Sequence, residues 1–206
     1  MSNEDHKQLV AAGYDKIGDI YLARFGISDV RGRKLAELEN GLSSGARVLD
    51  LGCGAGVPIA RDLTAHGFRV TGVDGSPGQI ARARHNVPDA MFIHADMTRV
   101  EFPCASFEAI GAFYAITHVP RDEHSTLLRQ ISRWLVPGGC FVGSFGASLA
   151  HDWTGDWLGT TMFFSHHDPE ATKNLASDAG LVIAKAELIQ QDNEDVRFLW
   201  ITAHKP

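Results

Sequence analysis

Three glycines at alternate positions and one later carboxylate form the pattern in this sequence that could do chemistry. Gly52, Gly54 and Gly56 directly follow one short apolar run, and Asp74 ends a second one. The spacing predicts a strand, a glycine turn, a helix and a second strand. Ligands of open α/β sheets bind at the carboxyl ends of the strands, and an acid in this position commonly binds ribose hydroxyls. The pattern therefore predicts a nucleoside-containing ligand.

Two other glycine-rich loops bind phosphates, and both fit this sequence poorly. The dinucleotide fingerprint Gly-x-Gly-x-x-Gly requires a third glycine, and Val57 or Ile59 stands at that position here, depending on the starting glycine. A P-loop requires Gly-Lys-Ser/Thr, which this loop lacks. A dinucleotide-dependent oxidoreductase is therefore the less favoured hypothesis. Glycines have no side chain, so a ligand can contact the loop backbone directly, and the absence of a lysine that would bind phosphate favours a nucleoside.

Short apolar runs alternate with helix-length segments through the middle of the chain. Strands are expected at 47–51, 69–73, 90–94, 107–113 and 140–145, with helices at 57–66, 76–86 and 122–135 between them. This alternation is typical of parallel βαβ units. A helix at 168–179 and two strands at 181–189 and 196–203 follow. We expect an α/β fold with a doubly wound, Rossmann-like, seven-stranded and mostly parallel sheet. It has an antiparallel C-terminal hairpin and helices on both faces.

Capping residues predict where these helices begin. Ser76, Asp122 and Asp168 are the expected N-caps of three of them. Before the first strand, helices are expected at about 5–25 and, after a cap at Ser28 or Asp29, up to residue 40. These two helices form either a packing layer or a lid over the ligand.

A single domain is expected, because 206 residues without a linker or repeat suit one domain. It divides into an N-terminal helical lid at 1–45, a cofactor-binding core at 46–146, an acceptor-site loop at 147–167 and a C-terminal helix and hairpin at 168–206. The acceptor-site segment is rich in Gly, Trp, Phe and His and has no clear period. We expect it to be an irregular functional loop.

Composition argues against several kinds of partner. The net charge is -6 and the basic residues form no run, so a nucleic-acid partner is not expected. The chain begins with a polar segment, and no apolar run approaches the ~18–20 residues that span a bilayer. We therefore expect no membrane partner and a cytoplasmic location, with monomer and homodimer both open. Cys53, Cys104 and Cys140 are too far apart for a zinc or disulfide framework.

Five motifs in order resemble those of the class I S-adenosylmethionine-dependent methyltransferases. They are Val-Leu-Asp-Leu-Gly-Cys-Gly-Ala-Gly at 48–56, Val-Thr-Gly-Val-Asp at 70–74, His-Ala-Asp-Met at 94–97, Ser-Phe-Glu-Ala-Ile at 106–110 and Leu-Val-Pro-Gly-Gly at 135–139. The Asn/Asp-Pro-Pro-Tyr signature of many amino-methylating nucleic-acid enzymes is missing, since Phe-Tyr-Ala-Ile-Thr-His occupies 113–118. The resemblance implies S-adenosyl-L-methionine as the cofactor and a small molecule as the methyl acceptor.

The resemblance also implies roles for individual residues. Asp74 would accept hydrogen bonds from both ribose hydroxyls, Asp96 would accept one from the adenine amino group, and Asp50 would approach the methionine end. Tyr14 and Tyr21 either close a lid over the cofactor or belong to the core. The full expected cofactor-binding set is Asp50, Gly52, Cys53, Gly54, Asp74, Gly75, Asp96, Met97, Phe113, Tyr14 and Tyr21.

Histidines are the candidates for a catalytic base. Methyl transfer from a sulfonium requires alignment and no metal, but an oxygen acceptor of high pKa also requires a base. His118 directly follows the fourth strand, beside the expected transfer site, with a structural hydrogen bond as its alternative role. His151 and His166 are further candidates. The run from His166 to Asp168 is not interpreted as a metal site, because adjacent side chains point apart and Asp168 suits a helix N-cap.

The acceptor-site segment has the aromatic and Met content of an apolar pocket wall, although it could instead cover the sheet edge or form a dimer contact. The expected acceptor-binding set is Tyr114, Trp153, Trp157, Met162, Phe164 and His167. We expect methyl transfer to a small-molecule acceptor, on oxygen or nitrogen, by in-line displacement. The main alternative is a non-catalytic S-adenosylmethionine-binding or regulatory module on the same fold.

Overall fold

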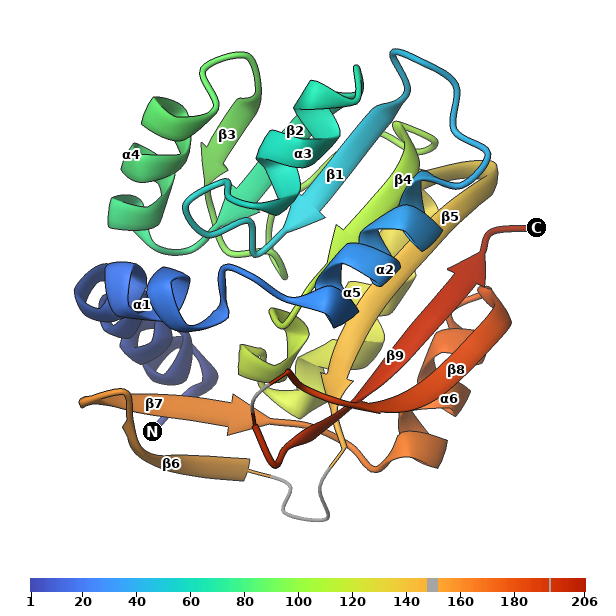
Figure 1. Cartoon of the computed structure of the whole chain (residues 1–206). Coiled ribbons are helices and arrows are strands. Elements are labelled where there is room, and N and C mark those ends of the chain that lie inside the picture. Colours follow the sequence, from blue (N-terminus) through green and yellow to red (C-terminus); the bar gives the residue numbers. More distant parts are fainter. Residues whose placement is uncertain (148–151, 193) are drawn as a thin grey trace.

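A seven-stranded sheet forms the centre of the protein (Figure 1). The structure is a computed structural model that describes residues 1–147, 152–192 and 194–206. The strand order is β3-β2-β1-β4-β5-β9-β8, with parallel pairing up to β5 and antiparallel pairing of β9 to both neighbours. The expected fold class is confirmed. The strands are β1 Arg47–Leu51, β2 Arg69–Asp74, β3 Met91–His94, β4 Phe107–Ala112, β5 Leu135–Gly146, β8 Val182–Gln190 and β9 Arg197–His204.

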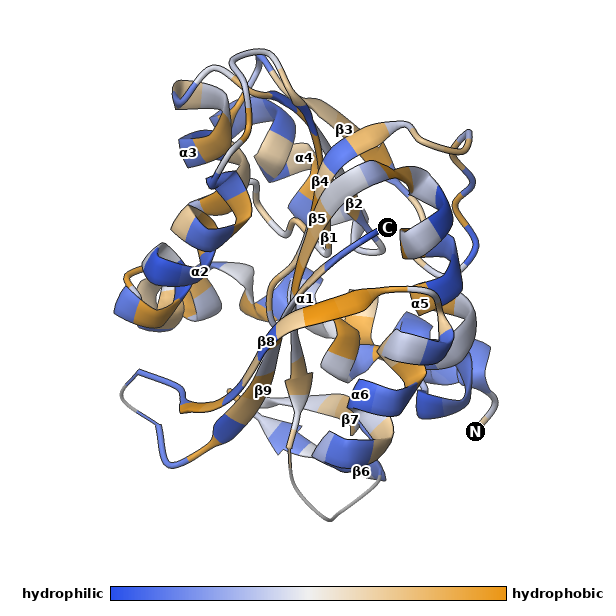
Figure 2. Cartoon of the chain, turned by 90° about the vertical axis from the view of Figure 1, so that its right-hand side faces the viewer, coloured by the Kyte–Doolittle hydropathy of each residue, from blue (hydrophilic) through white to orange (hydrophobic). Residues whose placement is uncertain are grey.

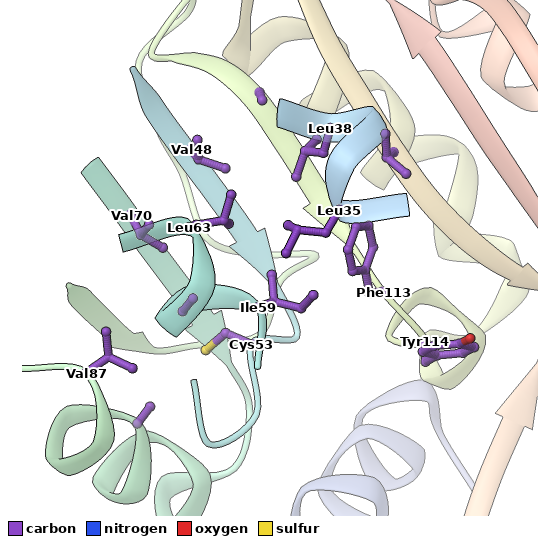
Figure 3. Close-up of a cluster of buried hydrophobic side chains, with 14 of the residues drawn as sticks. Leu35, Leu38, Val48, Cys53, Ile59, Leu63, Val70, Val87, Phe113 and Tyr114 are labelled. Carbon is purple, nitrogen blue, oxygen red and sulfur yellow. The ribbon is translucent and has the colours of Figure 1, made fainter. Parts of the chain in front are cut away.

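Helices cover both faces of this sheet because neighbouring strand residues point to opposite sides. Val48 packs in the cluster that contains residues of α2, α3 and α4, as Figure 3 shows for Leu38 and Leu63. Leu49 packs in the other cluster, which contains residues of α5 and α6, such as Leu127. The helices are α1 Asn3–Phe25, α2 Asp29–Glu39, α3 Ile59–Ala65, α4 Pro77–Asn86, α5 Arg121–Trp134 and α6 Pro169–Asp178, with a 3-10 turn η1 at Ile116–His118.

Most of the expected helix caps are confirmed. The hydroxyl of Ser76 accepts from the backbone N–H of Gln79, and the carboxylate of Asp168 accepts from that of Ala171. Asp122 was the wrong choice for α5, which begins at Arg121. The Asp122 carboxylate instead accepts a hydrogen bond from the side chain of Asn3 at 3.0 Å, so tertiary contact with α1 uses it.

Residues 152–165 contradict the expectation of an irregular loop. They form a separate antiparallel hairpin of β6, Asp152–Trp157, and β7, Thr160–Ser165. Leu158 and Gly159 form its turn with φ of 55° and 82°, which suits a two-residue hairpin connection. Aromatic residues on both faces of the strands hide the alternation of apolar and polar residues that would have indicated this hairpin.

The hairpin packs against α1, and the two together cover the carboxyl end of the sheet (Figure 1). The ring of His6 stacks on that of Phe163 at 3.9 Å between centroids. Gly13 lets the elements approach closely, because a Cβ there would lie 2.3 Å from the sulfur of Met162. The second face of α1 contacts α4, where the carboxylate of Asp15 accepts from the backbone N–H of Gly78 at 2.8 Å.

β8 is the outer strand of the sheet, and Figure 2 shows it in apolar colours along part of its length. A buried lysine of α2 ties this strand to α2 through an ion pair. The ammonium group of Lys34 lies 2.7 Å from a carboxylate oxygen of Glu187 and 3.0 Å from one of Glu37, and Lys34 is 2% exposed. Removing both carboxylates would leave the buried charge of Lys34 uncompensated. The pair therefore fixes the position of α2, which carries a residue of the cavity described below.

Among the described residues, no helix is both long enough and apolar enough to cross a membrane.

Acid is expected to destabilise the fold partly through His124. Burial lowers the pKa of His124 to about 4, whereas an unfolded histidine has a pKa of about 6.5. Between these two values the unfolded chain binds more protons than the native chain, so stability falls as the pH decreases. The loss is at most about 1.4 kcal/mol per pH unit for this group.

The His124→Gln variant tests this expectation by urea unfolding at pH 7, 6 and 5. Gln can still donate to the carbonyl of Val119, as the Nε2 of His124 does at 2.9 Å, but it does not titrate. Its free energy of unfolding should fall less steeply with pH than that of the wild type. His85, an exposed residue of α4, provides the control His85→Gln. An unchanged slope in His124→Gln would contradict the assignment.

Candidate active site

A cavity of about 410 Å³ lies where the carboxyl ends of the parallel strands meet α1. The loops after β1, β2, β3 and β4 contribute to its wall, as expected for an open α/β sheet. Every residue of the expected cofactor-binding set lines it, as does Tyr114. The structure therefore brings together residues from Tyr14 to Phe113 that the sequence assigned to one site only through its resemblance to a family.

The glycine loop after β1 turns sharply beneath the cavity. Gly52 has a φ of 72°, and a Cβ on it would lie 2.3 Å from the Cβ of Ala115. Its N–H donates to the carbonyl of Val73 at 2.8 Å, which joins the loop to β2. Gly54 also has a positive φ, of 53°, but a Cβ there would meet open space. Gly52 is thus required for packing, whereas Gly54 leaves room on the cavity side.

Asp74 organises this loop from the end of β2. One carboxylate oxygen accepts from the N–H of Gly54 at 2.9 Å, and the other accepts from the N–H of Ser76 at 2.8 Å. Burial raises the pKa of Asp74, while these two N–H donors act in the opposite direction. Each carboxylate oxygen has two acceptor positions, so Asp74 retains capacity for further hydrogen bonds from a ligand in the cavity.

Asp50 is a buried carboxylate at the end of β1. Burial and then the charge of Asp74 raise the pKa of Asp50 to about 7, with Arg31 acting against them. Its Oδ2 has no hydrogen-bond partner among the described residues. An unpartnered buried acceptor beside a cavity is costly without a ligand. Asp50 therefore suits a cationic or N–H-bearing group of a bound molecule.

Arg31 is a cavity residue that the sequence reasoning missed. It lies on α2, is 6% exposed and donates to the carbonyl of Phe25 and to the hydroxyl of Tyr21, the latter at 3.4 Å. Its guanidinium lies 5.3 Å from the centroid of the Tyr114 ring. The available signal was its position four residues before Leu35, on the apolar face of the helix. Arginine is rarely buried unless its charge is paired, so a buried arginine at such a position indicates a partner group.

Asp96 is held by a second missed residue, Lys7 of α1. The ammonium group of Lys7 lies 2.6 Å from the Oδ2 of Asp96, 3.1 Å from the hydroxyl of Thr98 and 2.9 Å from the carboxylate of Glu123. Burial opposes ionisation of Asp96, but the hydrogen bonds from Lys7 and Thr98 outweigh it and lower its pKa. Asp96 is therefore an oriented anion at the adenine side of the expected ligand.

His118 lines the cavity and is bonded to Tyr14, another residue of its wall. Its Nδ1 lies 2.8 Å from the carbonyl of Phe163, and its Nε2 lies 2.9 Å from the hydroxyl of Tyr14. A carbonyl only accepts, so Nδ1 carries the proton and the unprotonated Nε2 accepts from Tyr14. Burial lowers the pKa of His118 to about 4. The imidazole is therefore neutral near pH 7, with its basic nitrogen occupied by the phenol.

The other expected acceptor and base residues lie around the cavity or away from it. The Trp157 ring stacks on that of Phe25, and the Phe164 ring lies 4.5 Å from that of His118, so both stand behind the lining. Met162 is buried against α1 and Trp153 is 43% exposed.

The remaining candidates are histidines of the same segment. His167 Nε2 lies 2.9 Å from the carbonyl of Arg121, and His166 is buried beside Gly146. Neither is among the described residues that line the cavity. His151 lies outside the described residues. In the described ranges, no group of three His, Cys, Asp or Glu side chains could hold a metal ion.

Fold and site together define a class of protein. The sheet order with its antiparallel last pair, the glycine loop after β1 and the carboxylates at the ends of β1 and β2 and after β3 are those of Rossmann-like methyltransferases. Residues 48–139 match the family described as "Methyltransferase domain". The segment from 48 to 139 belongs to this methyltransferase family, and the chain as a whole has the Rossmann-like fold of class I S-adenosylmethionine-dependent methyltransferases.

Individual relatives agree with this assignment. The chain is 38% identical over 104 residues to the 27-O-demethylrifamycin SV methyltransferase of Amycolatopsis mediterranei, which covers 48% of this chain and 38% of that protein. The chain thus spans well under half the length of this relative. Among solved structures, the 1,6-didemethyltoxoflavin-N1-methyltransferase of Burkholderia thailandensis has a TM-score of 0.77 with 19% identity, over 100% of this chain and 91% of the other.

The same fold also occurs with a different activity. The [4+2]-cyclase SpnF is similar with a TM-score of 0.73 and 20% identity, over 95% of each chain. Similarity at this level of identity shows the fold alone, so the reaction must be argued from the site.

Proposed function

We propose that this protein transfers a methyl group from S-adenosyl-L-methionine to a small-molecule acceptor. The observation that carries the proposal is the placement of Asp50, Asp74 and Asp96 at the ends of three neighbouring strands around one cavity. A sulfonium is cationic, a ribose presents two hydroxyl donors and an adenine presents an amino donor. The three carboxylates match these three groups in this order along the sheet edge.

The chain's residues hold each part of such a cofactor by a distinct interaction. Asp74 accepts from the ribose hydroxyls while its loop contacts keep it oriented. Asp96, aligned by Lys7, accepts from the adenine amino group. Asp50 faces the cationic end, and Arg31 supplies a cation for the carboxylate there. When bound, the cofactor supplies the reactive methyl group, and the protein supplies alignment.

A small uncharged molecule is the proposed acceptor. The cavity wall near the 3-10 turn is made of apolar and aromatic side chains such as Val10, Tyr14 and Val119. The relatives named above act, by their names, on a rifamycin precursor at oxygen and a toxoflavin precursor at nitrogen. We therefore propose oxygen or nitrogen as the methylated atom. The second candidate is cofactor binding without methyl transfer, since the same fold also occurs in a protein named as a cyclase.

Two experiments separate these functions. S-adenosylhomocysteine should raise the melting temperature, because a ligand that binds only the native state stabilises it, whereas NAD should not. A screen of small phenols, hydroxyquinones, sterols and amines with S-adenosylmethionine should then reveal release of S-adenosylhomocysteine. A thermal shift without release from any acceptor would support the non-catalytic alternative, and a shift with NAD alone would overturn the proposal.

Binding of the cationic cofactor is expected to release protons from Asp50. Its pKa of about 7 means that roughly half of the molecules carry this proton at pH 7. A sulfonium nearby favours the carboxylate and lowers that pKa. Titration calorimetry in two buffers of different ionisation enthalpy should show release of up to about half a proton with S-adenosylmethionine. Less should be released with S-adenosylhomocysteine, which lacks the positive charge.

The Asp50→Asn variant is the control for this proton release. It removes the titrating group and keeps a side chain of similar size, so the difference between the two ligands should disappear. Equal proton release for both ligands in the wild type would place the sulfonium away from Asp50.

A further inference from the structure

We propose, on the basis of the proposed function, that Tyr14 and His118 form a proton relay for a hydroxyl-bearing acceptor. In this relay the phenol oxygen of Tyr14 receives the acceptor's proton, and the Nε2 of His118 receives the phenol's own proton. Tyr14 is thus the group that touches the acceptor, and His118 acts through it. The acceptor class is an alcohol or phenol that must lose a proton on methylation.

Hydrogen-bond geometry sets the direction of the relay. Because Nδ1 of His118 donates to the carbonyl of Phe163, only Nε2 can take a proton, and it lies 2.9 Å from the Tyr14 hydroxyl. That separation is within the reach needed for proton transfer. Tyr14 lines the cavity, and its oxygen has acceptor capacity left after donating to His118. An acceptor hydroxyl in the cavity can therefore donate to the Tyr14 oxygen. It cannot donate to His118 directly, because both ring nitrogens are already hydrogen-bonded.

The step balances in atoms and charge. The acceptor oxygen forms a bond to the methyl carbon, and the sulfur–methyl bond breaks with its electron pair remaining on sulfur. The acceptor's proton passes to the Tyr14 oxygen as the phenol proton passes to His118. The positive charge lost from the sulfonium reappears on the imidazole, so the net charge of the site is unchanged.

The surroundings of His118 hold the imidazole in its neutral form. Burial lowers its pKa to about 4, so it is neutral near pH 7 but a weaker base than a free histidine, and the charge gained on protonation must be stabilised within the site. When it becomes cationic, its Nδ1–H bond to the Phe163 carbonyl becomes charge-assisted and stronger. Phe163 belongs to β7, and Tyr14 belongs to α1. The relay therefore depends on the packing of both α1 and the hairpin beside His118.

The test compares Tyr14→Phe, His118→Gln and the double variant. Phe keeps the ring of Tyr14 and removes the relaying oxygen. Gln can still accept a hydrogen bond from Tyr14, but it cannot take a proton. A structural role of His118 that rests on its bond with Tyr14 would therefore survive in His118→Gln, whereas a relay would not.

Turnover is measured as release of S-adenosylhomocysteine from S-adenosylmethionine with a panel of phenols, hydroxyquinones and sterols. Each single variant should lose about 10²–10⁴-fold in kcat, the usual contribution of general acid–base catalysis. The kcat of the double variant should be no lower than that of the slower single variant, because both substitutions interrupt the same relay. The Kd for S-adenosylhomocysteine should stay within about threefold in His118→Gln, which shows that the site is intact.

The outcomes distinguish the relay from the proposed function. Wild-type kcat in either single variant, or losses that multiply in the double variant, would overturn the relay while leaving methyl transfer in place. Turnover of amines but of no hydroxyl compound in the wild type would overturn the relay alone, and absence of turnover with hydroxyl compounds and amines alike would overturn both. Loss of kcat together with loss of S-adenosylhomocysteine binding in His118→Gln would assign His118 a structural role and overturn the relay.

Discussion

The Asp74→Ala variant is expected to bind S-adenosylhomocysteine about 10- to 150-fold more weakly than the wild type. Hydrogen bonds to a charged group contribute about 1.5–3 kcal/mol, and each 1.4 kcal/mol corresponds to about tenfold in Kd. The substitution removes the carboxylate proposed for both ribose hydroxyls. It also leaves the N–H groups of Gly54 and Ser76 without their acceptor, so the glycine loop loses one of its anchors to β2.

Two further variants separate these effects in titration calorimetry with S-adenosylhomocysteine. Asp74→Asn keeps one side-chain oxygen as an acceptor, and an intermediate loss of affinity is expected. Asp89→Ala changes an exposed residue that does not line the cavity, and its affinity should equal that of the wild type. An affinity unchanged in Asp74→Ala would remove Asp74 from the ligand site.

The Gly52→Ala variant is expected to lose about 2–5 kcal/mol of folding stability. A left-handed φ costs an alanine about 1–2 kcal/mol, and overpacking adds about 1–3 kcal/mol. Both apply at Gly52, whose φ is 72° and whose added Cβ would lie 2.3 Å from that of Ala115. Because Ala115 is itself buried, neither side can move away freely.

The matched comparison is Gly54→Ala, two residues further along the same loop. Its φ of 53° carries the same kind of strain, but its added Cβ would meet open space, so about 1–2 kcal/mol is expected. Urea unfolding measures both variants, and the melting temperature should fall by roughly 2–4 °C for each kcal/mol in a chain of this size. Equal losses in the two variants would show that contact with Ala115 does not constrain the loop.

The cover of the cavity has two parts that come from distant segments. α1 contacts the cofactor side through the ion pair of Lys7 with Asp96, and it contacts the hairpin through His6 and Gly13. α1 therefore connects the expected cofactor side of the cavity with the hairpin. This arrangement gives the proposed Tyr14–His118 relay a physical basis, because Tyr14 belongs to α1 and His118, in the 3-10 turn, is bonded to Phe163 of the hairpin.

The sequence by itself determined the sheet and the cofactor half of the cavity. Alternating strands and helices, the spacing of Gly52, Gly54 and Gly56 and the position of Asp74 are local patterns, and each is read within about 30 residues. Parallel strands place their carboxyl ends at one edge whatever covers that edge. Residues at those ends, such as Asp50 and Asp96, therefore converge on the cavity, as the structure shows.

The tertiary structure alone decided what covers that edge. Lys7 contacts Asp96 from 89 residues away, and Tyr14 contacts His118 from 104 residues away. Such pairs depend on how α1 crosses the sheet edge, and no local period encodes that crossing. The hairpin at 152–165 was hidden for the same reason, since its strands bury aromatic side chains against α1 and alternate poorly. Packing between segments far apart in the chain therefore selects the groups that cover the cavity.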